Sequence, residues 1–246
     1  MDRMIYTAMS GARSMMQRQE VLANNLANVN TPGYRAETVA FRVAPLQGEG
    51  LQTRAMVAES TPGADFTPGV ITTTGQPLDA AIQGQGFFAV QASDGTEAYT
   101  RNGGFGVNDQ GLLQTQAGRL VLGDGGPISI PPGTVVSIAA DGSVSGAPAG
   151  GGKTTTPLGR LKLVNPPTVD ITRGPDGLFR TRGGAEAAAD PLVRIASGAI
   201  EGSNVNPVEA MVGMITLARQ FEMQMKLMQT ADAAARKGVQ LLSANG

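Results

Sequence analysis

Few side chains in this sequence carry groups suited to catalysis or metal binding, because its 246 residues include neither histidine nor cysteine. Zinc sites made of thiolate or imidazole, disulfides, cysteine nucleophiles and Ser-His-Asp triads are therefore excluded. Carboxylates remain, but most aspartates lie beside glycine or in turns, where the side chain bonds to its own backbone. A pair of carboxylates meeting in a cleft stays open as a minor alternative. We expect no catalytic residue and no metal site.

One glycine-rich segment invites a nucleotide-binding interpretation. Residues 147–154 read APAGGGKT and are similar to a degenerate phosphate-binding loop. Such a loop needs a buried strand before it and a helix after it, so that backbone N–H groups and the helix dipole meet the phosphates. Pro157 would end a helix almost at once. We therefore expect a flexible surface loop here and no cofactor.

Composition narrows the range of partners. The chain has 19 Lys and Arg against 20 Asp and Glu, a formal net charge of −1, which argues against nucleic acid as a partner. No run approaches the ~20 apolar residues of a membrane-spanning helix, so membrane insertion is not expected. The first residues lack a continuous apolar core, so a cleavable secretory signal is not expected either. The scattered arginines are interpreted as solvated surface and salt-bridge partners.

Secondary-structure elements must position the surfaces of this chain. The N-terminal 30 residues predict the first such element, a long helix. Apolar or small residues recur there at alternating spacings of three and four, which is typical of a heptad stripe on a helix. Gln19 is the one polar member, and Pro32 predicts the end of the helix near 28–33. The predicted packing residues are Ile5, Ala8, Ala12, Met15, Leu22, Leu26 and Val29.

The C-terminal 44 residues repeat this pattern. Pro207 suits the first turn of a helix, and Asn206 is among the possible N-caps. The stripe that follows has one polar member, Asp232. Its predicted packing residues are Met211, Met214, Ala218, Phe221, Met225, Met228, Ala235, Val239 and Leu242.

The middle of the chain predicts β-structure. Short alternating runs are separated by hairpin dipeptides, namely Asp94-Gly95, Asn102-Gly103, Asp141-Gly142 and Asp176-Gly177. The expected fold class is α+β, with long N- and C-terminal coiled-coil helices forming one domain and an inserted antiparallel β-rich domain resembling a barrel or sandwich. The expected divisions are an N-terminal helix over 1–30, an extended connector over 31–68, the β-rich domain over 69–202, and a C-terminal helix over 203–246 that pairs with 1–30.

Neither stripe could stay exposed in a stable molecule, because burying each Leu or Met is worth roughly 1.5–3 kcal/mol. We expect the termini to pack on each other, on other subunits, or on both. A core-facing helix of an ordinary domain stays open as the plainer interpretation.

Several long motifs resemble the flagellar rod and hook proteins. They are NNLANVNTPGYR at 24–35, MDRMIYTAM at 1–9, AESTPGADFTPG at 58–69, AYTRNG at 98–103, EGSNVNPVEAM at 201–211 and RQFEMQMK at 219–226. The resemblance covers the whole chain and fades only at 146–157. Within the family, the opening residues are most similar to proximal rod subunits.

The resemblance implies a structural subunit of the basal-body rod, without enzymatic activity, whose terminal helices polymerise into a hollow torque-transmitting shaft. It implies a location in the rod where that crosses the periplasm, reached through the flagellar type III export apparatus with no cleaved signal peptide. The implied partners are other copies of this chain, neighbouring proximal and distal rod proteins, and the surrounding rings. Two alternatives stay open: a distal rod or hook subunit of the same family, and a secreted β-rich enzyme or adhesin.

Overall fold

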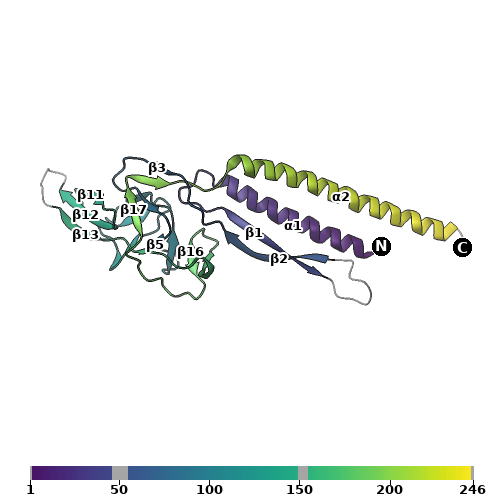
Figure 1. The fold of residues 1–246 in the computed structure, drawn as a ribbon, viewed down its shortest axis with the longest axis horizontal. Coiled ribbons are helices and arrows are strands. Elements are labelled where there is room, and N and C mark those ends of the chain that lie inside the picture. The colour runs from purple at the N-terminus through teal and green to yellow at the C-terminus, as the bar shows by residue number, and fades with distance from the viewer. Residues whose placement is uncertain (1, 46–54, 149–154, 245–246) are drawn as a thin grey trace. The chain divides into compact units, whose positions relative to one another are not determined.

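A computed structural model describes residues 2–45, 55–148 and 155–244 of the chain (Figure 1). It divides the chain into two compact units. The first comprises Met1–Ala27, Glu37–Gly63 and Asn206–Gly246, and the second comprises Asn28–Ala36 and Ala64–Val205. Within both units, side-chain surroundings are described for 9–42, 63–148, 155–230, 232–234 and 236.

The first unit contains the two long helices and a pair of strands. Helix α1 spans Asp2–Ala27 and helix α2 spans Pro207–Ala244, while β1 (Glu37–Pro45) and β2 (Ala55–Ala64) form a two-stranded sheet. A Cβ atom built on Gly11 would lie 3.4 Å from Nε2 of Gln224, and one built on Gly213 would lie 2.9 Å from Cδ1 of Leu22. Residue numbers rise along α1 as they fall along α2, so the helices pack antiparallel.

Local chemistry sets the helix ends. The side-chain oxygen of Asn206 accepts hydrogen bonds from the backbone N–H groups of Val208, at 3.1 Å, and Glu209, at 3.3 Å. This confirms Asn206 as the N-cap, with Pro207 in the first turn. After α1, Thr31 donates its backbone N–H to the carbonyl of Asn28, and Pro32 follows.

The second unit is built from short strands. Its elements in chain order are β3 (Ile71–Thr73), β4 (Ala80–Gln83), β5 (Phe87–Gln91), β6 (Glu97–Thr100), β7 (Phe105–Val107), β8 (Leu113–Thr115), β9 (Leu122–Gly123), β10 (Gly126–Pro127), β11 (Thr134–Ile138), β12 (Ser143–Pro148), β13 (Thr156–Arg160), β14 (Leu163–Val164), the 3₁₀ turn η1 (Thr168–Asp170), β15 (Ile171–Arg173), β16 (Phe179–Thr181), β17 (Arg194–Ser197) and β18 (Ala199–Glu201). They form a five-stranded sheet ordered β14-β5-β6-β16-β15, a three-stranded sheet ordered β11-β12-β13, and pairs β10-β9, β17-β4, β18-β3 and β7-β8.

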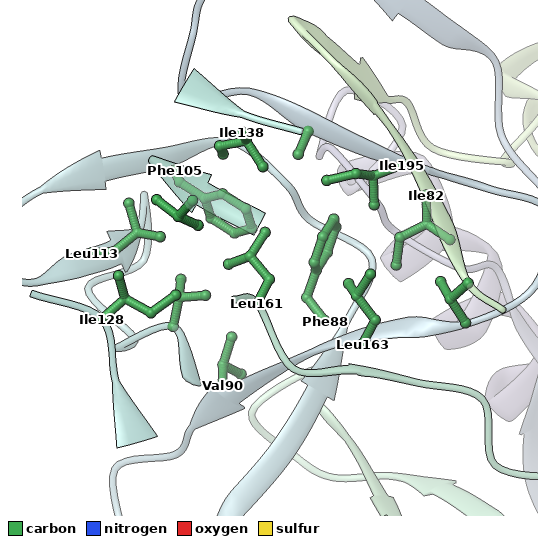
Figure 2. Packing of buried hydrophobic residues seen from close by; sticks show 14 of the residues in the cluster. Ile82, Phe88, Val90, Phe105, Leu113, Ile128, Ile138, Leu161, Leu163 and Ile195 are labelled. Carbon is green, nitrogen blue, oxygen red and sulfur yellow. The ribbon is translucent and has the colours of Figure 1, made fainter. Parts of the chain in front are cut away.

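Strand β5 is buried on both faces and so joins two cores. Side chains alternate across a strand, which sends Phe88 and Val90 into the larger cluster and Phe87 and Ala89 into the smaller one. Figure 2 shows Phe88 and Val90 among the side chains of the larger cluster. Aromatic rings pack at a tilt in the smaller cluster, with Phe87 and Phe179 centroids 5.4 Å apart and ring planes at 53°.

Three of the four predicted hairpin dipeptides join adjacent antiparallel strands. Asp94-Gly95 joins β5 to β6, Asp141-Gly142 joins β11 to β12, and Asp176-Gly177 joins β15 to β16. Asn102-Gly103 does not form such a turn. A Cβ atom on Gly103 would lie 1.6 Å from the carbonyl oxygen of Ala80, so this glycine serves a close backbone crossing instead.

The expected fold class is wrong. The described residues hold two α-helices against eighteen strands, so the fold is mostly β. The contacts between the helices include two glycines, Gly11 beside Gln224 and Gly213 beside Leu22, and so depart from the regular apolar ladder of a coiled coil. The helices share their unit with β1 and β2, and the strands of the second unit are divided among several small sheets.

Two further findings bear on the sequence expectations. Strands β1 and β2 lie within 31–68, where the sequence analysis expected an extended connector. The glycine-rich residues 149–154 of the loop similar to a phosphate-binding loop lie outside the described residues, and strand β13 follows them where such a loop requires a helix.

Candidate functional site

Helix α2 presents two faces of different character. Ala210 and Leu217 are buried, and Met214, Phe221 and Gln224 are half-buried. Their spacing places them on one face of the helix, and the contact of Gln224 with Gly11 shows that this face meets α1. This face is therefore used within the unit.

The first two turns of α2 carry a second, exposed apolar face. Val208, Met211, Val212 and Ile215 follow the i, i+3, i+4, i+7 spacing of one helix face, and their exposed fractions run from 50% for Met211 to 68% for Val208. We call these four residues the α2 patch. Large contiguous apolar patches are uncommon on monomeric proteins and mark interaction surfaces.

Charged residues bound the α2 patch along the helix. Arg219, Glu222 and Lys226 continue the same face at spacings of four, three and four, and all three are exposed. Further exposed apolar side chains on the two helices are Met9, Met16, Met223, Met225 and Leu227.

Fifteen of the sixteen predicted packing residues lie in the two helices, and Val29 follows the end of α1 at Ala27. Ala12 is buried; the half-buried members are Met15, Leu22, Leu26, Val29, Met214, Phe221 and Met228; and the exposed members are Met211, Ala218 and Met225. The helical segments also contain Ile5, Ala8, Ala235, Val239 and Leu242, whose side chains lie outside the described residues.

The sequence analysis did not single out Val208, Val212 and Ile215. It followed one stripe along α2, whereas the helix has apolar residues on two sides. The i, i+3, i+4, i+7 spacing that starts at Val208 was the available signal.

A buried ion cluster lies inside the second unit, at the segments that follow α1 and precede α2 in the chain. Glu201 accepts a 2.8 Å contact from Nη2 of Arg35 on Oε1 and a 2.8 Å hydrogen bond from Nε of Arg101 on Oε2. Both arginine side chains are 2% exposed and the glutamate side chain is fully buried. These two arginines form salt bridges, as the sequence analysis interpreted the arginines, but they are buried, so the expectation of solvated side chains is wrong for them.

Backbone groups complete the cluster. The backbone N–H of Gly69 donates to Oε1 of Glu201, and Nη1 of Arg35 donates to the carbonyl of Thr67, each at 2.8 Å. Arg101 donates from Nη1 to the carbonyl of Gly86 and from Nη2 to that of Gly84. Charge-assisted bonds of this kind are the strong ones, and they fix the loops that supply the acceptors.

The cluster carries one positive charge in excess, because two guanidinium groups face one carboxylate. Burial lowers the pKa of Arg101, the charge of Glu201 raises it, and the neighbouring charge of Arg35 lowers it again. Arginine stays protonated nonetheless, so the excess charge is a fixed feature of this interior.

Backbone segments around the ion cluster lie close together and are joined by hydrogen bonds. Gly33 donates its N–H to the carbonyl of Glu201 at 2.8 Å, and Ala36 donates to the side-chain oxygen of Asn204 at 2.7 Å. Gly33 has a φ of +68°, and a Cβ atom there would lie 2.3 Å from the backbone carbon of Arg101. Only glycine fits this position.

A cavity of about 350 Å³ opens beside the cluster. Arg35 and Arg101 line it together with Phe66, Phe87 and the segment 165–169. Among the described residues we find no cluster of acidic side chains able to hold a metal ion. Neither helix, over its described length, is apolar enough to cross a membrane.

Comparison with known proteins gives consistent family matches. Three family models match: "Flagella basal body rod protein" over residues 5–35, "Flagellar hook protein FlgE/F/G D1 domain" over 81–146, and "Flagellar basal body rod FlgEFG protein C-terminal" over 196–241. Each matched segment supplies one charge of the ion cluster, namely Arg35, Arg101 and Glu201 in turn.

Similar full-length proteins carry the same family name. The chain is 50% identical to the flagellar basal-body rod protein FlgF of Salmonella typhimurium LT2 and 48% identical to that of Escherichia coli K12, over 99% of each chain. It is 33% identical to the flagellar basal-body rod protein FlgG of Agrobacterium fabrum, over 95% of this chain and 97% of the relative.

Proposed function

This chain belongs to the FlgF family of flagellar basal-body rod proteins and is a structural subunit of the rod; on that premise we propose that its copies polymerise through their terminal helices. The assembly would form part of a hollow shaft that transmits torque. The α2 patch carries this proposal. Each buried apolar side chain contributes roughly 1.5–3 kcal/mol, and the same contact recurs for every subunit added.

The occupant of the α2 patch in this proposal is a neighbouring rod subunit. Arg219, Glu222 and Lys226 follow the patch on the same face and would limit the apolar contact to the first two turns. A short apolar contact bordered by charges has the composition of an interface centre with a polar rim. Of the predicted residues that are exposed, Met211 is a member of the α2 patch, whereas Ala218 and Met225 lie outside it.

The finer placement is part of the proposal. We place the subunit in the proximal rod, where the rod crosses the periplasm, between other copies of itself and neighbouring proximal and distal rod proteins. Delivery through the flagellar type III export apparatus and contact with the surrounding rings complete the partner set. The family membership supports each of these assignments.

The buried ion cluster suits a subunit under mechanical load. It ties residues 35, 101 and 201 together through charge-assisted hydrogen bonds between buried side chains. Breaking such a buried pair is strongly opposed, because it leaves an uncompensated charge in the interior. The second unit can therefore resist deformation near the segments that continue into the helices.

The test replaces Ile215, a 55% exposed member of the α2 patch, by aspartate. Isoleucine and aspartate differ little in helix propensity, so the helix should persist. In a strain lacking its own copy, Ile215→Asp should abolish swimming and yield basal bodies with an incomplete rod. The purified variant should keep the helical circular dichroism of the parent.

Thr230→Asp is the matched control. Thr230 is exposed on the same helix, away from the α2 patch, and the change introduces the same charge. This variant should swim normally. Normal rods in the Ile215→Asp strain, or equal loss of rods in both strains, would contradict assembly through the α2 patch.

A further inference from the structure

The cavity beside the ion cluster is lined by both cationic and apolar residues. Its described lining includes Arg35 and Arg101 and no acidic residue. Phe66, Phe87 and Pro166 supply apolar surface, and Val169 at the rim is 71% exposed. A ligand that satisfies both parts needs a negative charge and an apolar body.

Charge balance points to an anion. Glu201 neutralises one of the two guanidinium groups, and the remaining positive charge lies in an interior where both arginines are 2% exposed. An isolated buried charge is costly unless a counter-charge lies close to it. Water could accept a hydrogen bond there but would leave the charge uncompensated.

A hydrogen-bond donor of Arg35 that lacks an acceptor also favours an anionic ligand. Nε of Arg35 is buried and has no acceptor among the described residues. An arginine carries five N–H donors, and Arg35 uses one toward Thr67 and one toward Glu201. Orphaned buried donors are rare in native proteins, and a ligand oxygen in the cavity would supply the acceptor that this one lacks.

Size sets the class of ligand. The volume of about 350 Å³ lies at the lower end of small-molecule pockets and greatly exceeds the ~30 Å³ share of one water molecule. We propose that this cavity is a binding site for a carboxylate with a short aliphatic or aromatic body, held by Arg35 and Arg101. The carboxylate could be an acidic side chain of a neighbouring subunit or a free organic acid, because the recognising chemistry is the same.

The test uses butyrate as the probe and butyramide as its neutral counterpart. The full chain, dilute enough to be monomeric, is titrated with each at constant ionic strength while the amide resonances of Gly84 and Gly86 are followed. Butyrate should shift them saturably, and butyramide should not. Because the measurement is made on the monomer, it does not depend on assembly through the α2 patch.

Two surface variants locate the site. Val169→Asp adds a negative charge at the rim and should weaken butyrate binding about fivefold or more, because like charges a few ångströms apart repel. Leu192→Asp adds the same charge at an 81% exposed residue that does not line the cavity, and should bind as the parent does. Equal shifts with butyramide, or unchanged binding by Val169→Asp, would overturn the proposal.

Sedimentation velocity at high protein concentration separates the two sources. If a neighbouring subunit supplies the carboxylate, butyrate and Val169→Asp should both reduce self-association while Leu192→Asp should not. If the ligand is a free acid, butyrate should bind and leave self-association unchanged. Both results support a carboxylate site, and absence of saturable butyrate binding rejects it.

Discussion

Nε of Arg101 donates a 2.8 Å hydrogen bond to Oε2 of Glu201, joining residues that lie 100 positions apart in the sequence. Arg35, a further 66 positions before Arg101, contacts the other oxygen of the same carboxylate. The three charges come from three separately matched family segments. A contact of such long range forms only when most of the second unit has folded, so it reports on the whole unit.

Replacing Glu201 by glutamine should strongly destabilise the second unit. The substitution keeps the shape but leaves two buried guanidinium groups without a counter-charge, and breaking a buried pair typically costs about 3–5 kcal/mol. Denaturant unfolding followed by amide resonances of β5 and β6 would measure the loss.

Glu186→Gln is the control for that change. The side chain of Glu186 is 73% exposed and lies 3.7 Å from Nζ of Lys162, and an ion pair whose carboxylate lies in solvent contributes about 0–1 kcal/mol. Similar losses in the two variants would mean that the ion cluster adds no more than an ordinary surface pair.

Gly33→Ala should lower the free energy of unfolding of the second unit by more than backbone strain alone would. Its φ of +68° disfavours any side chain, and the new Cβ atom would also meet the backbone of Arg101 at 2.3 Å. Gly75 has a similar φ of +73° with open space around it, so Gly75→Ala measures the strain by itself, about 1–3 kcal/mol. The difference between the two free energies of unfolding isolates the steric clash. Equal losses would show that the backbone relaxes around residue 33.

Regular local patterns made much of the fold predictable. The heptad spacing indicated both helices, Asn206 and Pro207 marked the start of α2, and three Asp-Gly dipeptides marked hairpins. Asn102-Gly103 has the same local chemistry but serves a backbone crossing near Ala80, which depends on a distant segment. Local spacing cannot distinguish these two uses of glycine.

The buried ion cluster was not predictable from composition. Arginines are exposed in most proteins, so sequence statistics assign Arg35 and Arg101 to the surface. Their burial follows from a partner 100 or more positions away and from carbonyl acceptors on the loops at 67 and 84–86. The outward face of α2 was missed for a different reason, because apolar residues on two sides of a helix make the helical phase ambiguous.

Acid should weaken the β15–β16 hairpin through one ion pair. The hydrogen bonds from Arg180 are the main cause that lowers the pKa of Asp176, with a smaller contribution from the backbone of Leu178. A lowered folded-state pKa means that the stabilisation is present above the unfolded aspartate pKa of about 3.9 and is lost as the pH falls through the folded value. Asp176→Asn should therefore cost about 1 kcal/mol at pH 7 and progressively less as the pH falls below about 3.9.

Asp124→Asn provides the comparison for that titration. Asp124 is an exposed turn residue for which the described part of the chain offers no ion pair. Its replacement should change the free energy of unfolding at pH 7 by less than about 0.5 kcal/mol, as exposed substitutions usually do. If Asp176→Asn gives a constant loss between pH 2 and pH 7, the contribution is not electrostatic.

The two faces of α2 should separate stability from assembly. Leu217 is 8% exposed on the inward face, so Leu217→Ala should destabilise the helix pair by about 2–4 kcal/mol and speed amide exchange throughout α2. Ile215 is 55% exposed, and Ile215→Ala should change helix stability by less than about 0.5 kcal/mol, because exposed substitutions rarely do more. The same Ile215→Ala change should still reduce rod assembly, since it removes most of one apolar side chain from the α2 patch.

Amide exchange measured on both variants, together with swimming assays, tests whether the inward face of α2 serves stability and the outward face serves assembly. If Ile215→Ala loosens α2 as much as Leu217→Ala does, the outward face also packs within the subunit and cannot be the assembly surface.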